Sequence, residues 1–507
     1  MAHIPPIVRR LAGRQIRRAL APIHRRQGRR MRARVRRDLA ASRPERSAWW
    51  GDDPHWYPVG TPPRQHNQVT ALVHGETYFA ALLEALNEAQ QYVYVIGWCL
   101  TPHLPLQRKT TRHMVQSQVV TVLQETARRV PVRVLLWSGA RVLFEPRQEL
   151  TQEAARILEG AEGSDLQCRL DTSAHFSHCH HQKAIVIDGR IAFVGGMDLT
   201  TLQGDRWDTE QHPLRAGPNW HDAQVRIEGE AVADVEHNFR QRWRAVTGDD
   251  TLPHQDPQHE AAWHTPVQIV RTIARRTYKE LPHGEYGIHH AYTRTLRAAR
   301  RLIYLENQYL WSPEVLAALV AAMNTPHEEP FRIVIVLPAS AYDGKFDNDQ
   351  HVKELLAQDA GRGIVSVYCP YAWGPSAGTH AFHYHPIYVH AKVAIVDDEW
   401  LIVGSANLND RGLITDSEIC TLIHDQDLAR DLRLDLWAEH LGMTRDRVAG
   451  ADVVELIDRE WTGRAADNKA AIQQADRPLV GTLHRYEGGR MPGSWLLEEA
   501  EALTVEH

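Results

Sequence analysis

The stretch HQKAIVID, residues 181–188, decides the fold, because it recurs 209 positions later as HAKVAIVD, residues 390–397. Both copies read His-x-Lys, four residues, then Asp. Each is followed at the same interval by a turn of small residues, GGMD at 195–198 and GSAN at 404–407. One copy of so short a pattern would be weak evidence, since many strand ends could supply it. Two copies with matching turns indicate two similar halves that build one site.

The apolar segments around the two motifs repeat in the same order. When the motif histidines are aligned, YVYVIGW at 92–98 falls opposite LIYLENQ at 302–308 with a shift of one residue. Each run follows a stretch with helical apolar periodicity, and each motif lysine opens a short apolar strand. Strands that alternate with helices are typical of βαβ units and of a sheet with helices on its faces. The helical stretches are residues 76–90 and 289–301, and a further pair of buried strands is predicted at 131–137 and 331–337.

The repeat is far longer than the period of a solenoid, so duplication of a whole domain explains it better. We predict an α/β fold of two similar lobes, each a mixed β-sheet flanked by helices, packed with pseudo-twofold symmetry. The predicted domains are a basic N-terminal arm at 1–66, a first lobe at 67–250, a second lobe at 251–450 and a C-terminal extension at 451–507. A chain of 507 residues has room for these domains and their cores.

Charge is distributed unevenly along the chain. Residues 1–46 contain fifteen Arg and two acidic residues, whereas the remaining residues contain 43 basic and 61 acidic side chains. A nuclease would normally carry positive charge around its cleft, so the acidic body argues against nucleic acid as a partner. The arm predicts contact with an anionic membrane surface, with a solvated tail as the alternative.

The apolar segments and the cysteines of the sequence predict a cytoplasmic protein that associates peripherally with membranes. The sequence has no uninterrupted apolar run of transmembrane length and no apolar core of a secretory signal, so we expect neither. Its five cysteines are scattered and lack CxxC spacing, which favours reduced thiols over a disulfide framework.

The duplicated His-x-Lys pairs suit the chemistry of a phosphodiester. Residues i and i+2 of a strand share a face, so His181 projects with Lys183 and His390 with Lys392. Two ammonium groups match the non-bridging oxygens of a phosphodiester. One imidazole can attack phosphorus while the other protonates the leaving oxygen, because an unperturbed pKa of roughly 6.5 allows one neutral and one charged ring. We expect no metal ion and no cofactor, since the lysines neutralise the charge.

Further polar and small residues are candidates for the same site. Gly196, Ser405 and Asn407 in the two turns are candidate substrate-binding residues. Histidine orientation usually requires a carboxylate on the second ring nitrogen, and Asp222 and Glu418 are the best candidates, with structural salt bridging as the alternative. The remaining motif residues, Asp188 and Asp397, are interpreted as turn formers or supporting residues and not as acids at phosphorus.

Two clusters of histidines invite a zinc reading, which we disfavour. Neither cluster has cysteine partners or the His-Glu-x-x-His helix signature of a zinc enzyme. We expect these side chains to line the cleft or cap strand ends. They are His175, His178, His180 and His181 in the first half, and His380, His383, His385 and His390 in the second.

These motifs resemble those of the phospholipase D superfamily, whose two-lobed members carry the HxKxxxxD pattern twice. The first motif block, from His180 through Leu199, resembles that of the eukaryotic-type enzymes. So do DRWD at 205–208 and WHD at 220–222, while the second block, from Ile387 through Arg411, and ENQY at 306–309 extend the match. The resemblance covers roughly residues 70–445.

The resemblance implies phosphatidyl transfer through a covalent phosphohistidine, with water or an alcohol as the acceptor. It also implies that His181 is the nucleophile and His390 the general acid. Two positions depart from the superfamily pattern: Asp198 stands where many members place Asn, and Gly412 stands where Ser is usual. The membrane-targeting domains of the eukaryotic enzymes are not found in the roughly 70 residues before the first lobe, which favours a compact bacterial enzyme with a monomeric active unit.

Three classes of function therefore remain. The first is a phospholipase D that hydrolyses glycerophospholipids to phosphatidic acid and free headgroup. The main alternative is a phosphatidyltransferase of the cardiolipin synthase type, whose members usually bear N-terminal transmembrane helices. A nuclease is disfavoured by the acidic body, and a non-catalytic scaffold by the two intact motifs. The loops at roughly 200–220 and 371–388, which would select the headgroup, carry no readable code.

Overall fold

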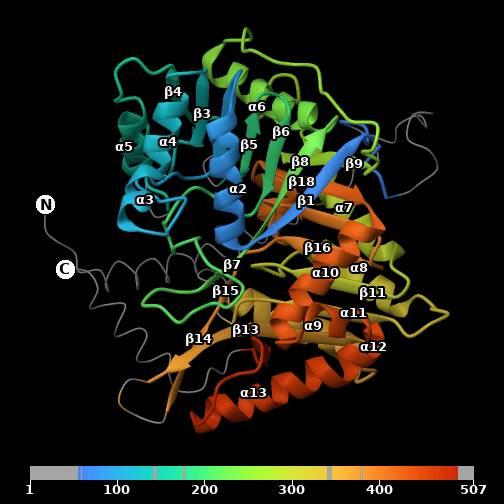
Figure 1. The fold of residues 1–507 in the computed structure, drawn as a ribbon. Helices are drawn as coiled ribbons and strands as arrows, with labels where there is room; N and C mark the ends of the chain where they lie inside the picture. Colours follow the sequence, from blue (N-terminus) through green and yellow to red (C-terminus); the bar gives the residue numbers. More distant parts are fainter. Residues whose placement is uncertain are drawn as a thin grey trace, which may run out of the picture.

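The computed structural model describes residues 55–58, 60–140, 145–174, 178–339, 345–376, 378 and 381–488. Figure 1 shows the first lobe, coloured blue to green, stacked on the second, coloured yellow to red, with helix α13 at the far end of the second lobe. The predicted α/β fold of two similar lobes is confirmed. The basic segment at 1–46 lies outside the described residues.

The first lobe is built on a seven-stranded mixed sheet with the order β1-β8-β6-β5-β2-β3-β4. Its central strands pair in parallel (β2 with β3, and β3 with β4), whereas the strands that follow the motif pair antiparallel. The strands are β1 (Asn67–Val73), β2 (Val93–Gly97), β3 (Val132–Trp137), β4 (Leu166–Asp171), β5 (Ala184–Ile187), β6 (Ile191–Gly195) and β8 (Ala223–Gly229).

The second sheet repeats this topology strand for strand. Its ten-stranded order contains the run β9-β18-β17-β16-β11-β12-β13, with the same parallel and antiparallel pairings, and adds β10, β14 and β19 at its edges. The common strands are β9 (Val267–Ile273), β11 (Leu302–Glu306), β12 (Arg332–Val336), β13 (Val365–Pro375), β16 (Val393–Val396), β17 (Trp400–Gly404) and β18 (Glu418–His424). The additions are β10 (Glu285–Tyr286), β14 (Phe382–Pro386) and β19 (Leu483–Arg485).

Alternation along the strands assigns side chains to three cores. In β2, Val93 and Val95 face the outer helices of the first lobe, whereas Tyr94 and Ile96 face the second lobe. The core between the lobes also contains α6 and α10, and the third core joins α7 and α8 to the outer face of the second sheet. Burial on both faces explains why these strands read as continuous apolar runs.

Four helices correspond between the lobes by their place among the strands, α2, α4, α5 and α6 in the first lobe and α7, α8, α9 and α10 in the second. The first lobe has α2 (His74–Glu88), α3 (Thr111–Gln116), α4 (Val119–Thr126), α5 (Gln148–Leu158) and α6 (Val232–Thr247). The second lobe has α7 (Gly287–Ala298), α8 (Pro313–Asn324), α9 (Lys345–Asp359), α10 (Gln426–Leu441), α11 (Arg445–Ala449), α12 (Val453–Glu455) and α13 (Thr462–Gln474), with π-helical turns at Arg411–Thr415 and Leu456–Trp461.

Two predicted boundaries differ from the structure. The arm was expected to reach residue 66, yet Trp56 and Tyr57 are buried in the core of the second lobe, and Arg64 exchanges backbone hydrogen bonds with Val267 of β9. The predicted C-terminal extension is also integrated into that lobe, because β19 pairs with β13 and Trp461 joins the core between the lobes. Apolar side chains explain both differences, since each segment carries enough of them to be held by the body.

Candidate active site

Both motif histidines lie directly before a central strand and contact the opposite lobe. His181 precedes β5, and its backbone N–H donates to the carbonyl of Ser417 in the second lobe at 2.9 Å. His390 precedes β16, and its N–H donates to the carbonyl of His221 in the first lobe at 2.7 Å. There, strand β15 (Tyr388–Val389) pairs in parallel with β7 (Trp220–His221). Two short crossings between the lobes therefore bring the motifs together.

Each motif histidine receives its carboxylate from the other lobe. Nδ1 of His181 lies 2.9 Å from Oε1 of Glu418, and Nδ1 of His390 lies 2.6 Å from Oδ2 of Asp222. The structure thus places both carboxylates that the sequence suggested within hydrogen-bond distance of the rings. An ionised carboxylate that accepts the Nδ1–H fixes the tautomer that leaves Nε2 free for chemistry.

The two carboxylates occupy equivalent positions in the duplicated fold. Gly195 pairs with Gln224, and Gly404 pairs with Cys420, so each carboxylate lies two residues before the partner of a turn glycine. The pairing across the lobes is therefore a consequence of the pseudo-twofold symmetry. Both carboxylates are buried, with Asp222 at 0% exposure and Glu418 at 1%.

The electrostatics differ from the expectation of one neutral and one charged ring. Burial, with Lys183 and Lys392 nearby, lowers the pKa of His181 well below its usual value. Burial, with Lys392 and Arg206 nearby, has the same effect on the pKa of His390. Both rings are therefore neutral near pH 7 in the protein alone, because neither site offers the water that stabilises an imidazolium.

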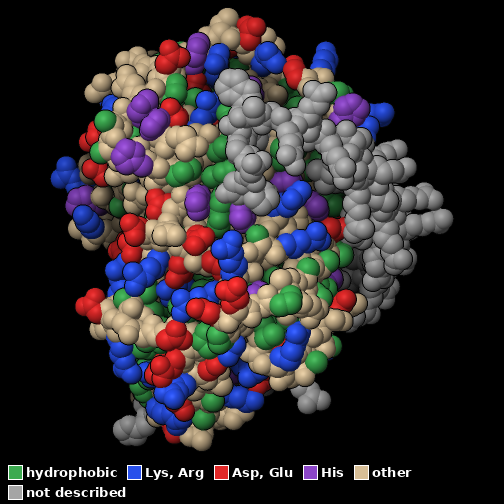
Figure 2. Space-filling model, turned by 90° about the vertical axis from the view of Figure 1, so that its right-hand side faces the viewer, with side chains coloured by type: hydrophobic (Ala, Val, Ile, Leu, Met, Phe, Trp, Pro, Cys, Tyr) green, Lys and Arg blue, Asp and Glu red, His purple; other side chains and the backbone are tan. Residues whose placement is uncertain are grey.

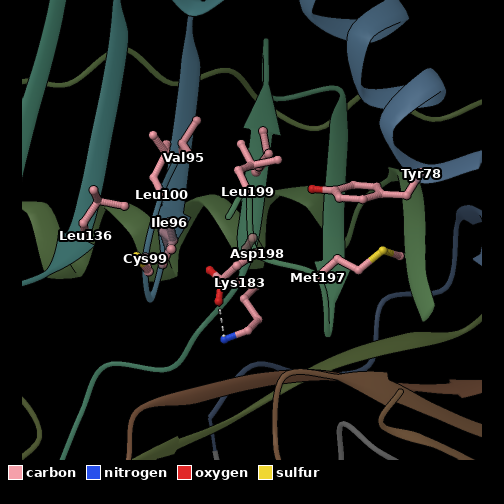
Figure 3. A pocket seen from close by; sticks show the side chains of 13 residues that line it. Tyr78, Val95, Ile96, Cys99, Leu100, Leu136, Lys183, Met197, Asp198 and Leu199 are labelled. Carbon is pink, nitrogen blue, oxygen red and sulfur yellow. Dashed lines mark ion pairs between the residues drawn. The ribbon is translucent and has the colours of Figure 1, made fainter. Parts of the chain in front are cut away.

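The two motif lysines are buried, and their polar contacts differ between the lobes. Lys183 Nζ lies 2.9 Å from Oδ2 of Asp198, and Figure 3 shows these two side chains pointing toward one another beneath a mainly apolar pocket. Each lysine also donates from Nζ to the carbonyl of its own motif histidine, Lys183 to His181 and Lys392 to His390, so the difference is that Asn407 takes the position of Asp198 in the second lobe. Burial lowers the pKa of Lys392 to about 7. The ion pair gives Asp198 a role that the sequence left open.

Asp188 and Asp397 do not reach the reacting groups. Asp188 turns the chain after β5 with a φ of 56°, and its carboxylate accepts hydrogen bonds from the backbone N–H groups of residues 90–92. Asp397 has a φ of 57° and accepts from the N–H groups of residues 300–302 in the same manner. Each aspartate therefore ties its motif hairpin to the start of the neighbouring strand, in agreement with their interpretation as turn formers.

Two turn residues that were expected to bind substrate contact the orienting carboxylates. The Ser405 hydroxyl hydrogen bonds to Oε2 of Glu418. Gly196 is the equivalent residue, and a Cβ there would lie 2.1 Å from Oδ1 of Asp222. Asn407 stays a candidate phosphate donor through its Nδ2 amide group, whereas its buried Oδ1, which only accepts, has no hydrogen-bond partner among the described residues. At Gly412, a Cβ would lie 2.3 Å from the Asn407 carbonyl oxygen, which explains why serine is replaced.

The histidines that suggested zinc do not form a metal-binding group within the described part of the chain. His180 is fully buried and lies 3.0 Å from Oδ1 of Asp171 and 3.0 Å from the Ser417 hydroxyl. His383 is exposed on β14. His175 and His380 lie outside the described residues.

Three residues near the rings were not singled out as site residues by their sequence pattern. The rings of Trp98 and His181 lie 6.0 Å apart, and those of Trp220 and His390 lie 5.1 Å apart. The Arg206 guanidinium lies 4.0 Å from the Trp220 ring centroid and helps to lower the pKa of His390. A usable signal existed for Trp98, which directly follows β2 and lies opposite Gln308 in the aligned halves.

The surface charge, the cysteines and the helices give three further findings. On the face drawn in Figure 2, acidic and basic side chains are intermixed and form no continuous basic stripe where the described atoms are visible. All five cysteines are buried, and none of them forms a disulfide. In the described part of the chain, no helix combines the length and apolar character that spanning a bilayer requires.

The chain has a duplicated fold, and both lobes contribute residues to one site. These two features place it in the class of bilobal proteins with paired HxKxxxxD motifs. The family model described as phospholipase D matches residues 85–219 and 215–314. The model described as cardiolipin synthase, PLD-like domain, matches residues 292–438. The chain belongs to the phospholipase D superfamily and is similar in sequence to its eukaryotic-type members.

Individual relatives give the same result. Phospholipase D alpha 4 of Arabidopsis thaliana is 26% identical over 491 residues, which cover 73% of this chain and 64% of the relative. Phospholipase D A of Dictyostelium discoideum is 27% identical over 472 residues, covering 75% of this chain and 36% of the relative. The chain thus spans less than two thirds of the length of either protein.

One solved structure shares the fold. Phosphatidylserine synthase of Haemophilus influenzae Rd KW20 superposes with a TM-score of 0.50 at 14% identity, over 87% of this chain and 96% of that one. This likeness concerns the arrangement of the lobes alone.

Proposed function

We propose that the protein is a phosphodiesterase that hydrolyses glycerophospholipids to phosphatidic acid and free headgroup through a phosphohistidine, and that it can transfer the phosphatidyl group to an alcohol. One observation carries the proposal: two histidines, each bonded to a carboxylate of the opposite lobe, share a buried site with two lysines. Because one chain supplies both halves of this site, a monomer is sufficient for activity.

The first chemical step forms a phosphorus–nitrogen bond and breaks a phosphorus–oxygen bond. Nε2 of His181 attacks phosphorus, with its Nδ1–H held by Glu418, and the headgroup oxygen leaves with a proton from Nε2 of His390. The ammonium groups of Lys183 and Lys392 balance the charge on the non-bridging oxygens. His390 is neutral in the protein alone, so a bound phosphodiester anion must raise its pKa by offsetting the lysine charges.

The second step reverses these roles at the same atoms. His390, now neutral, takes a proton from water or an alcohol, whose oxygen attacks phosphorus and breaks the bond to His181. Water yields phosphatidic acid, whereas an alcohol yields a new phospholipid. The assignment of His181 as nucleophile and His390 as acid rests on the family resemblance, because the two rings have equivalent surroundings.

Relatives and charge together favour phospholipid as the substrate. The matched relatives are named phospholipases D, and an acidic body suits nucleic acid poorly. A phosphatidyltransferase of the cardiolipin synthase type is the second candidate, favoured by the description of the family model that matches residues 292–438. The two candidates differ in the acceptor and not in the first step.

A panel of headgroup-labelled phospholipids, assayed with and without glycerol or a primary alcohol, tests the proposal. We expect phosphatidic acid and free headgroup in water, and a transfer product at the expense of phosphatidic acid when alcohol is added. Formation of a diphosphatidyl product from phosphatidylglycerol, with little phosphatidic acid, would identify the synthase instead. Cleavage of single-stranded DNA with no lipid turnover would contradict both candidates.

We further propose that the basic segment at 1–46 brings the acidic body to an anionic membrane. Basic residues near an anionic leaflet contribute roughly 1 kcal/mol each, so a few engaged arginines offset the repulsion of the body. Deletion of residues 1–46 should leave turnover of a short-chain monomeric substrate unchanged and reduce both binding and turnover on anionic vesicles, most strongly at low salt. Equal vesicle binding by both forms would remove the segment from the mechanism.

Activity on a monomeric substrate should fall as the pH rises above about 7. His390 must be protonated, and its lowered pKa makes the protonated fraction grow as the pH falls. The Lys392 ammonium loses its charge near its pKa of about 7. Lys392→Met should lower kcat/KM by on the order of 100-fold. It should also move the alkaline limb to higher pH, because loss of a nearby cation raises the pKa of His390.

Exposed Lys279 offers the matched control for this measurement. Lys279→Met should leave both the kcat/KM value and its pH profile unchanged. An alkaline limb that stays in place in Lys392→Met would show that the two groups are not electrostatically coupled.

A further inference from the structure

A second buried group of histidines lies between the lobes, apart from the reacting rings. It combines His74, His212 and His221 of the first lobe with Glu439 of α10 in the second. One nitrogen or oxygen of each residue lies within 4.8 Å of the others, and the three histidines are at most 3% exposed. The group borders the active site, since the backbone N–H of His74 donates to the backbone carbonyl of Asp222 at 2.9 Å.

The three imidazoles converge on the carboxylate of Glu439. Nε2 of His74 lies 2.8 Å from Oε2, Nε2 of His212 lies 3.1 Å from Oε1, and Nδ1 of His221 lies 3.2 Å from Oε1. In a tetrahedral zinc site with bonds of about 2.0–2.1 Å, neighbouring ligand atoms lie roughly 3.3 Å apart. The nitrogens of His212 and His221 therefore lie close to this separation from Oε1, and Nε2 of His74 approaches the other oxygen of the same carboxylate.

The opposite nitrogens of two of these rings face carboxylates. Nε2 of His221 lies 2.7 Å from Oε2 of Glu306, and Nδ1 of His212 lies 3.1 Å from Oδ2 of Asp208. Metal-binding histidines usually place their second nitrogen against such an acceptor. A neutral imidazole has a single N–H, so a ring that donates it outward turns a lone pair toward Glu439.

The Nδ1 atoms of all three histidines have no hydrogen-bond partner among the described residues, and the one on His221 faces Glu439. Nδ1 of His221 is buried and has no hydrogen-bond partner among the described residues, although Oε1 of Glu439 lies 3.2 Å away. The ring is therefore not aimed at the oxygen as a donor would be. A cation between this nitrogen and the carboxylate would give the nitrogen a partner, while Oε1 already has one in Nε2 of His212.

We propose that His74, His212, His221 and Glu439 bind one divalent transition-metal ion, with Zn²⁺ preferred by the ligand set. Three imidazoles and a carboxylate suit zinc better than calcium or magnesium, which take oxygen ligands. All four positions come from the protein, which is the pattern of a structural site. The ion links the three histidines of the first lobe to Glu439 of the second. It does not take part in the transfer reaction, which uses the lysines.

Metal analysis of the full-length protein tests the proposal. Protein expressed in zinc-replete medium and passed over a chelating resin should retain about one zinc ion per chain. His74→Gln should lose most of this zinc, whereas His103→Gln, which changes an exposed histidine, should keep it. Zinc-free wild-type protein, or equal zinc in His74→Gln and wild type, would overturn the proposal.

A second measurement uses wild-type protein alone, in case His74→Gln does not fold. After removal of metal with chelator in dilute denaturant, restoring Zn²⁺ should raise the melting temperature by about 5 °C or more. Co²⁺ in its place should give the visible absorption of a four-coordinate nitrogen and oxygen site. An unchanged melting temperature, or the weak spectrum of octahedral Co²⁺, would mean that the group is a metal-free hydrogen-bond network.

Discussion

Replacement of His181 or His390 with alanine is expected to abolish turnover, with a loss of at least about 10⁴-fold in kcat for either variant. The two rings perform different steps of one reaction, so neither can replace the other. Loss of only a few-fold from one replacement would contradict a single shared site. Exposed His254 provides the control, and His254→Ala should retain wild-type activity.

Phosphorus labelling distinguishes the two roles. In His390→Ala the nucleophile remains, so a substrate labelled at phosphorus should leave a transient label on the protein. His181→Ala should acquire none. The reverse pattern would exchange the nucleophile and the acid without changing the proposed reaction class.

Removal of the carboxylates is expected to have the next largest effect. Asp222→Asn and Glu418→Gln keep the size of each side chain but can present an amide N–H to the ring and favour the wrong tautomer. A comparable change in a serine protease triad lowers kcat by about 10⁴-fold, and we expect losses between about 10² and 10⁴ here. Asp427→Asn, at an exposed position in the first turn of α10, is the control.

The crossed pairing makes the two variants separable by leaving group. A nitrophenyl phosphodiester needs little protonation of its leaving oxygen, so it should restore most of the first step to Asp222→Asn, which impairs the acid. Glu418→Gln impairs the nucleophile and should remain slow. Equal rescue of both variants would contradict the pairing of His390 with Asp222 and of His181 with Glu418.

The duplicated fold could be predicted because its signals are local and occur twice. The strands at 92–98 and 302–308 are short apolar runs whose burial on both faces makes them easy to recognise. The boundaries were harder to predict, since Trp56 and Trp461 lie in segments without a motif. Only the packed chain shows that they complete a core of the second lobe and the core between the lobes.

The site was predictable to the extent that its residues belong to repeated patterns. His181, His390 and their lysines follow from the motif, and the carboxylates from the need to orient a ring. The use of Ser405 on a carboxylate could not be predicted, because it depends on the distance between two strands. The cluster at Glu439 was missed for the same reason, as its histidines are far apart in sequence and lack a spacing rule.

Each motif histidine depends on a carboxylate of the other lobe, so the protein can become active only after both lobes have been synthesised. His181 depends on Glu418, which lies in a strand that the ribosome completes only after most of the chain has been made. A nascent first lobe therefore holds a nucleophile without its orienting partner and without the second lysine. Under the proposed function, transfer begins only when the last strands of the second sheet are in place, so an unfinished or truncated chain is inactive.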